Sequence, residues 1–332
     1  MTGTAVTISR VCSDQVTSAP SPGSPATDGD PPVPRVSVCV PVYDKGRYLA
    51  RTLESVLAQT FTDFELVVLD NASTDGSAAV AAAFSDPRIV LVHNESTVPA
   101  PQNFRRVVEL SSAPLVKVVN ADDLIHPTAL ERQVAVMDAD PSLAVVSCRH
   151  DLVDDDDAVV ARNRVLRTDD LLGRQERAAV IRRVVRHGGN PLGVPGNMLF
   201  RRSAYDACGG YPDDPFVLDV GLGVRLVTEG AFFGMPECLS SFRLAVGSVS
   251  SSARARNLRL QREFIRGLRR EHAAVVRPHD VAFGRLRAPL TWLRHHLLMS
   301  ASSAPGSPVQ RMTSLVLDPR RALGRGSSAP PA

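Results

Sequence analysis

The strongest pattern in the chain lies at residues 36–77, which read VSVCVPVYDKGRYLARTLESVLAQTFTDFELVVLDNASTDGS. The stretch begins inside an apolar, β-branched run, RVSVCVPVY (35–43), and contains a second run of the same kind, FELVVLD (64–70). Between them, residues 48–60 carry Leu49, Leu53, Val56 and Leu57 at helical spacing. Strand, amphipathic helix and strand with short connections are typical of a buried parallel βαβ unit.

The same alternation continues on the C-terminal side of this unit. Periodicity predicts helices over 77–84, 103–110 and 127–139, and strands over 89–94, 115–123 and 143–148. Strands that alternate with helices favour an α/β fold with a mostly parallel, Rossmann-like sheet flanked by helices. In such sheets ligands bind beyond the carboxyl ends of the strands.

The rest of the chain is less regular. Residues 149–250 hold the acidic run 151–157, expected as a hairpin turn, a basic helix (174–189), a strand (198–202) and a helix (217–230). Residues 254–296 are helical in pattern, and eleven arginines against three acids give them a net charge of +8. The 332 residues contain five widely spaced cysteines and no CxxC pair, which argues against a disulfide framework and a zinc site.

Two adjacent acids follow the predicted strand 115–123. Asp122 and Asp123 repel each other unless a cation or hydrogen bonds stabilise both charges. Carboxylate oxygens at a strand end suit Mg²⁺ or Mn²⁺. The alternative is that an aspartate here caps the helix that follows. The position at the ligand edge of the sheet favours the metal site.

Two further acids are candidates for chemistry. Asp70 ends a predicted strand and could accept a hydrogen bond from a base or a ribose hydroxyl, although DNASTDG also reads as a capped turn. Asp219 lies in the apolar setting VLDVGLGV, where partial burial raises a pKa toward that of a general base. From that segment alone, an ordinary carboxylate on a solvated helix face is the simpler reading.

These segments, in order over residues 35–250, resemble family 2 glycosyltransferases of the GT-A fold. The stretch 36–77 resembles the opening of that family, and LVKVVNADDLIHPTALERQV resembles its DxD-type segment. GNMLFRRSAYDACGGYPDD and FVLDVGLGVRLVTEG resemble its acceptor half, in which Asp219 is the matching acid. The chain departs from the family pattern at Asn120, Arg105, Leu218 and Ala245.

The resemblance implies an inverting sugar transfer from a nucleotide-diphosphate donor to an acceptor hydroxyl. It implies that Asp122 and Asp123 hold Mn²⁺ or Mg²⁺ and that Asp219 is the general base. It also implies a nucleotide-sugar pocket lined by Pro41, Val42, Tyr43, Asp44, Asp70, Asn103 and Asp122. Acceptors of this kind are carbohydrates, lipid-linked molecules or small molecules, as in polysaccharide or glycoconjugate biosynthesis.

The expected organisation is a leader (1–33), a nucleotide-sugar half (34–148), an acceptor half (149–252), a basic helical extension (253–300) and a flexible tail (301–332). A degenerate glycosyltransferase-like binding module is the second hypothesis, motivated by the departures at Asn120, Leu218 and Ala245. A nucleotidylyltransferase ranks last because no Gly/Lys/Arg-rich phosphate loop lies near the first strand. Nucleic acid is not an expected partner at a net charge of +3.

We expect a cytoplasmic chain, because no signal-peptide core and no apolar run of transmembrane length occurs. The basic segment 254–299 has two readings. It packs on its own domain through an apolar face, which is the commoner arrangement, or it contacts the inner face of a membrane peripherally through Trp292 and nearby leucines and arginines.

Overall fold

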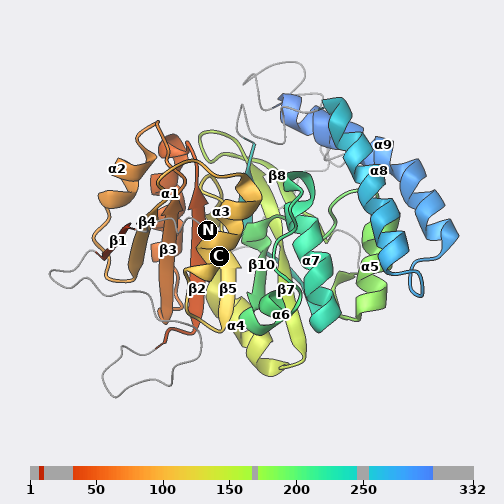
Figure 1. The fold of residues 1–332 in the computed structure, drawn as a ribbon, viewed down its shortest axis with the longest axis horizontal. Coiled ribbons are helices and arrows are strands. Elements are labelled where there is room, and N and C mark those ends of the chain that lie inside the picture. Colours follow the sequence, from red (N-terminus) through yellow and green to blue (C-terminus); the bar gives the residue numbers. More distant parts are fainter. Residues whose placement is uncertain (1–6, 11–32, 167–170, 245–253, 302–332) are drawn as a thin grey trace, which may run out of the picture.

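The computed structural model describes residues 7–10, 33–166, 171–244 and 254–301. Its centre is one mixed sheet with the strand order β1-β4-β3-β2-β5-β10-β7-β11-β6, to which β8 and β9 are added on β7 and β11 (Figure 1). Helices cover both faces of this sheet, so the α/β fold expected from the sequence is confirmed.

The first half of the sheet is parallel. Strands β2 (Val36–Val42), β3 (Phe64–Asp70), β4 (Ile89–His93) and β5 (Leu115–Val118) pair in parallel in the order β4-β3-β2-β5. Every side chain of β2 is buried, as expected for a strand covered on both faces. The ends of β2, β3 and β5 therefore lie side by side, and the polar residues at or after these ends, among them Asp44, Asp70 and Asp122, come to one edge of the sheet.

Strands of the second half extend the sheet with antiparallel neighbours. They are β6 (Leu124–Ile125), β7 (Leu143–Val153), β8 (Val159–Arg164), β9 (Gly173–Gln175), β10 (Met198–Arg201) and β11 (Ala231–Arg243). β10 runs antiparallel between β5 and β7, whereas β7 and β11 are parallel. The thirteen-residue β11 pairs with β7, β9 and β6, and so joins the second half to the segment that follows the acidic pair.

The helices form two layers. Helices α1 (Gly46–Leu57), α2 (Ser77–Ala82) and α4 (Ala129–Ala139) pack on the face that carries Val38 and Val40. Helices α3 (Ala100–Glu109), α5 (Arg177–His187), α6 (Arg202–Ala207) and α7 (Leu218–Glu229) cover the face of Cys39 and Val67. Alternate residues of each strand therefore feed two separate cores, as the period-two geometry of a strand requires.

The C-terminal helices α8 (Arg254–Glu271) and α9 (Pro278–Ala301) form the end of the molecule on the right of Figure 1. They pack on each other, and α9 also packs on α5. The expected helical extension is thus present. No described helix is both long and apolar enough to cross a membrane.

Two local expectations change. Residues 7–10, expected in a flexible leader, form β1 (Thr7–Arg10) antiparallel to β4; residues 1–6, 11–32 and 302–332 lie outside the described ranges, and residue 301, expected in the tail, ends α9. The predicted strand 115–123 ends at Val118, so the acidic pair sits in a loop. The acidic run is a hairpin turn between β7 and β8, as expected, but Asp155 and Asp157 pair with Arg47 and Arg51 of α1 rather than being merely solvated.

Candidate active site

The β2–α1 loop lies against the β3–α2 loop at the edge of the parallel strands. Asp44 has a positive φ of 48°, and its Oδ1 accepts a hydrogen bond from the Thr74 N–H at 2.8 Å. Asp75 Oδ2 accepts from the Gly46 N–H at 2.8 Å, so Asp75 joins the two loops. Pro41 and Val42 lie in buried β2, whereas Tyr43 is 49% exposed. The two loops thus form a rigid rim with Tyr43 on its surface.

Asp70 ends β3 and is almost fully buried. Its Oδ2 accepts from the Ser73 N–H at 3.2 Å and lies 3.5 Å from His93 Nδ1. Its other oxygen, Oδ1, is buried and meets no hydrogen-bond donor among the described residues. A buried acceptor left without a donor is costly unless a ligand or water supplies one. This feature agrees with the predicted hydrogen bond from Asp70 to a base or a ribose.

Asn103 of α3 belongs to a chain of buried amides beside Asp70. Asn94 Nδ2 donates to Asn103 Oδ1 at 3.0 Å and to Asn71 Oδ1 at 2.7 Å. Asn94 Oδ1 is another buried acceptor for which the described part of the chain offers no donor. Asn103 therefore has an indirect role: it helps to position Asn94, whose side chain also bonds Asn71 just after the end of β3.

The two adjacent acids differ in environment. Asp122 is partly accessible, and its Oδ2 lies 2.6 Å from Nζ of Lys45, the residue that precedes α1. Asp123 is buried: its Oδ1 accepts from the Arg243 N–H at 3.0 Å and its Oδ2 from Asn120 Nδ2 at 2.9 Å. Burial, followed by the charge of Asp122, raises the pKa of Asp123 well above its usual value. The helix-cap alternative fails, because β6 intervenes and α4 begins after Thr128.

Arg243, which sequence reasoning missed, holds this acidic loop in place. It ends β11 and is buried; its Nε donates to the Asp122 carbonyl at 2.9 Å and its Nη1 to the Asp154 carbonyl at 2.6 Å. The guanidinium also pairs with Asp157 and lies over the Tyr48 ring. The only signal in the sequence is a single arginine in the otherwise uncharged run CLSSFRLAV.

Asp219 lies in the first turn of α7 and retains part of its exposure. Desolvation by the surrounding protein nevertheless raises its pKa to about 7. Its negative charge also makes a small contribution to the raised pKa of Asp123, after those of burial and of the Asp122 charge. A fully solvated helix carboxylate does not describe this environment.

The loop 190–197 is held in place by buried polar side chains of the core. Lys117 is completely buried in β5; its Nζ donates to the Gly196 carbonyl at 2.6 Å and to Gln133 Oε1 at 2.8 Å. Desolvation lowers the pKa of Lys117 to about 8. Gly193 has a φ of +107°, and a Cβ there would lie 2.8 Å from Asn197 Cγ, so only glycine fits. The conformation of this loop is thus set by the core beneath it.

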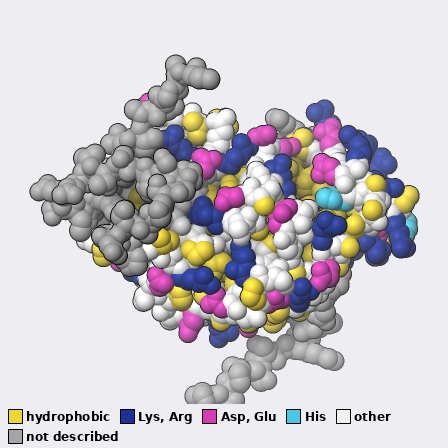
Figure 2. Space-filling view, turned by 60° about the horizontal axis from the view of Figure 1, so that its bottom comes forward, with side chains coloured by type: hydrophobic (Ala, Val, Ile, Leu, Met, Phe, Trp, Pro, Cys, Tyr) yellow, Lys and Arg dark blue, Asp and Glu magenta, His cyan; other side chains and the backbone are white. Residues whose placement is uncertain are grey.

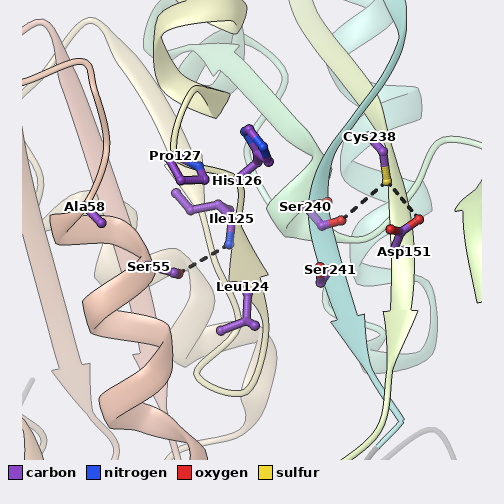
Figure 3. A pocket seen from close by; sticks show the side chains of 10 residues that line it. All are labelled: Ser55, Ala58, Leu124, Ile125, His126, Pro127, Asp151, Cys238, Ser240 and Ser241. Carbon is purple, nitrogen blue, oxygen red and sulfur yellow. Dashed lines mark hydrogen bonds between the residues drawn. The ribbon is translucent and has the colours of Figure 1, made fainter. Parts of the chain in front are cut away.

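A separate pocket of about 310 Å³ lies between α1, β6, β7 and β11 (Figure 3). Ser55 Oγ accepts from the Ile125 N–H on one side, and Cys238 Sγ lies 3.1 Å from Asp151 Oδ1 on the other. The described residues that line it include none of the predicted site residues. Within the described ranges, no three acidic, histidine or cysteine side chains are grouped as a metal site.

Comparison with known proteins agrees with this arrangement. Residues 37–209 match the family described as glycosyl transferase family 2. The chain is 30% identical over 303 residues to the uncharacterized protein MT1568 of Mycobacterium tuberculosis, covering 89% of this chain and 92% of that protein. It is 30% identical over 102 residues to UDP-Glc:alpha-D-GlcNAc-diphosphoundecaprenol beta-1,3-glucosyltransferase WfgD of Escherichia coli, which covers 31% of this chain and 40% of that enzyme.

Among solved structures, the mannosyltransferase PcManGT from Pyrobaculum calidifontis, in complex with GDP-Man and Mn²⁺, is similar with a TM-score of 0.56. That likeness covers 88% of this chain and 83% of the other at 18% identity, so it speaks for the fold alone. The family match extends over more than half of the chain. With the GT-A sheet and its acidic edge, this shows that the chain belongs to family 2 of the glycosyltransferases.

Proposed function

We propose that this glycosyltransferase moves a sugar from a nucleotide-diphosphate donor to an acceptor hydroxyl, with inversion and with Asp219 as general base. Residues 34–148 would bind the donor and residues 149–252 the acceptor. The observation that best supports the proposal is the partly buried position of Asp219 in the first turn of α7, where desolvation raises its pKa to about 7. A base with that pKa is effective at neutral pH.

Donor binding is proposed at the carboxyl ends of β2 and β3. The unsatisfied Oδ1 of Asp70 suits an N–H of a base or a ribose hydroxyl, and the exposed Tyr43 ring offers a surface for stacking. Pro41, Val42 and Asp44 shape the same rim, and Asn103 supports it through Asn94. The names of similar proteins mention UDP-Glc and GDP-Man, which fits a nucleotide-sugar donor without selecting a base.

The donor set at the acidic loop fits Mn²⁺ or Mg²⁺. The Asp122 carboxylate is partly accessible. In the absence of a donor, the Lys45 ammonium lies beside it, at a position where a metal ion would also be attracted. Of the two predicted ligands, Asp122 is the better placed, because both oxygens of Asp123 accept hydrogen bonds and that carboxylate fixes the loop. A bound divalent ion supplies charge neutralisation for the departing diphosphate.

In the proposed reaction Asp219 accepts the proton of the acceptor hydroxyl as the oxygen attacks the anomeric carbon. The bond between that carbon and the diphosphate oxygen breaks on the opposite face, so the configuration inverts and a nucleoside diphosphate leaves. We assign Lys45 and Asp122, which pair with each other, to the diphosphate side of the transferred sugar, and Asp219 to the acceptor side.

The departures from the family pattern have structural accounts, which is why we do not favour a non-catalytic binding module. Asn120 donates its amide to Asp123, where an aspartate would add a third negative charge. Leu218 is buried in the core beneath α7. Arg105 donates to the Tyr211 carbonyl and pairs with Asp213, and so fixes the segment before Asp219. Ala245 lies outside the described residues.

The test is a screen of nucleotide sugars for nucleoside diphosphate release with Mn²⁺ and candidate acceptors. Asp219→Asn should lower turnover by roughly 10²–10⁴-fold, the usual contribution of a general base, and leave the donor Kd nearly unchanged. Asp214→Asn is the matched control. The Asp214 side chain accepts a hydrogen bond from the Phe216 N–H in the turn before α7, which an asparagine can also accept, and Asp214 is not a proposed catalytic group. Full turnover in Asp219→Asn would end the assignment.

We also propose that the chain works beside a membrane, with a peripheral contact through residues 254–299, as the second reading of the sequence holds. A lipid-linked acceptor would then be presented to the cleft at high local concentration. WfgD, by its name, acts on a diphosphoundecaprenol-linked acceptor, which suits this choice among acceptor classes. Phosphatidylglycerol-containing vesicles added to the transfer assay with a lipid-linked acceptor should raise the rate; an unchanged rate would count against it.

A further inference from the structure

Helix α9 has one face that is packed tightly on its own domain. Gly284 and Ala288 are buried, and a Cβ on Gly284 would lie 2.0 Å from the Val185 carbonyl oxygen of α5. Thr291 Oγ1 donates to the Gly188 carbonyl at 2.7 Å, just past the end of α5. Residues 284, 288 and 291 follow helical spacing, so they define a single buried face. This face agrees with the first interpretation of the basic segment, namely that it packs on its own domain.

The opposite face of α9 is apolar and exposed. Phe283 is 42%, Leu286 74%, Leu290 67% and Leu293 46% exposed. Their spacing of three, four and three residues places them on one stripe, called here the α9 stripe. Exposed apolar side chains are common singly, but four in a row along one helix indicate a surface that binds something. Trp292, singled out in the sequence, is half-buried beside the stripe instead.

Positive charge surrounds the α9 stripe. Arg285 is exposed, and the guanidinium groups of Arg186 and Arg287 lie over the Phe283 ring at 5.3 and 5.5 Å. The acid on the same helix, Asp280, is fully buried and pairs with Arg182 and, at 3.8 Å, with Arg186 of α5. It offsets part of the Arg186 charge, so Arg285 and Arg287 are the main positive charges beside the stripe. Figure 2 shows basic side chains gathered at the α8–α9 end of the molecule, with hydrophobic ones among them.

We propose that the α9 stripe docks on an anionic phospholipid surface. Leucine and phenylalanine side chains enter the region between headgroups and acyl chains, while arginines along the helix reach the phosphates. A second copy of the chain suits this face less well, because symmetric pairing would bring like-charged arginines together. The proposal rests on the proposed function only for its purpose, namely access to an acceptor in the membrane; the docking itself is independent of donor and acceptor.

The test is co-sedimentation of the full chain with phosphatidylcholine vesicles, with and without phosphatidylglycerol. Wild-type protein should sediment with the anionic vesicles and be released by high salt. The double variant Leu286→Glu/Leu290→Glu should reduce the bound fraction by about tenfold or more, because it places two charges at the apolar interface. Val33→Glu is the matched control: Val33 is 65% exposed but lies far along the chain from α9, and its replacement should leave binding unchanged.

Because Leu286 and Leu290 are exposed, the double variant should keep the melting temperature of the wild type. Equal sedimentation of wild type and double variant would overturn the proposal, as would the absence of binding to anionic vesicles. Light scattering tests the alternative that a second copy of the chain covers the stripe. If the wild type is a dimer, the double variant is a monomer and neither binds vesicles, the stripe is a dimer interface and lipid docking is refuted. Loss of glycosyl transfer in Asp219→Asn has no bearing on any of these outcomes.

Discussion

The two halves of the molecule are built on different principles. In the first half, β2, β3, β4 and β5 are joined by helices next to them in sequence, and each strand end carries its own polar cluster. In the second half, β11 pairs with three strands that are distant in sequence, and Asp219 is desolvated only through the tertiary fold. The proposed donor site is thus encoded locally, whereas the environment of the proposed base and the contacts that hold the acidic loop depend on the tertiary fold.

The largest expected effect concerns Arg243, where the second half reaches into the first. Arg243→Met removes a buried cation: Asp157 keeps its pair with Arg51 but loses the buried one, and the carbonyls of Asp122 and Asp154 lose their guanidinium donors. Breaking a buried ion pair costs about 3–5 kcal/mol. Urea denaturation should show a loss of that size in the free energy of unfolding.

Arg162→Met is the control for this experiment, because Arg162 pairs with Asp151 while remaining 72% exposed. Exposed pairs contribute about 0–1 kcal/mol, so the control should differ little from the wild type. If the two variants lose equal stability, the acidic loop does not depend on β11 and the contrast between the halves weakens.

The second prediction concerns pH. Because burial raises the pKa of Asp219 to about 7, the base is increasingly protonated, and therefore inactive, as the pH falls below that value. Turnover at saturating donor, acceptor and metal should fall about tenfold per pH unit below 7, and be level above it. A carboxylate with an ordinary pKa would keep the rate flat down to about pH 5. That flat profile would show that the second half does not create the desolvated environment of Asp219.

The third and smallest prediction belongs to the first half. The Lys45 ammonium and a divalent ion cannot share Asp122 Oδ2, so Lys45→Met should tighten Mn²⁺ binding in the absence of donor, by roughly tenfold for one charge-assisted hydrogen bond. Isothermal titration with Mn²⁺ measures this directly. Arg47→Met is the control, since Arg47 pairs with Asp155 instead. Unchanged or weaker Mn²⁺ binding in Lys45→Met would show that the ammonium does not compete for the cation position.

What the sequence could predict follows the same division. The spacing of Leu49, Leu53 and Val56 and the unbroken apolar run of β2 are local signals, and they placed the first strands and helices within a few residues. The ligand edge followed from parallel topology, because the ends of neighbouring parallel strands coincide. The pairing of β10 between β5 and β7 has no local signature and could not be read from these patterns.

Side-chain environments were harder to predict than elements. Asp122 and Asp123 are adjacent in sequence, yet only the fold shows that Asp122 is partly accessible and pairs with Lys45, whereas Asp123 is buried and bonded to the Arg243 N–H. β1 escaped detection because its four residues gain order by pairing with β4 and not from their own composition. Trp292 drew attention by residue type, whereas exposure, a tertiary property, selects Leu286 and Leu290.

The length of β11 has a consequence for redesign. This strand pairs with β9 at its start, with β7 along its length and with β6 near its end, so it is held in the sheet at several points. If the segment between β9 and β10 is replaced by that of a homologue, the pairings of β11 with β7 and β6 lie outside the replaced segment and are kept. Chimaeras that graft the 190–197 loop and keep Lys117 and Gln133, whose side chains hydrogen-bond to its carbonyls, would therefore test whether this loop sets the acceptor preference.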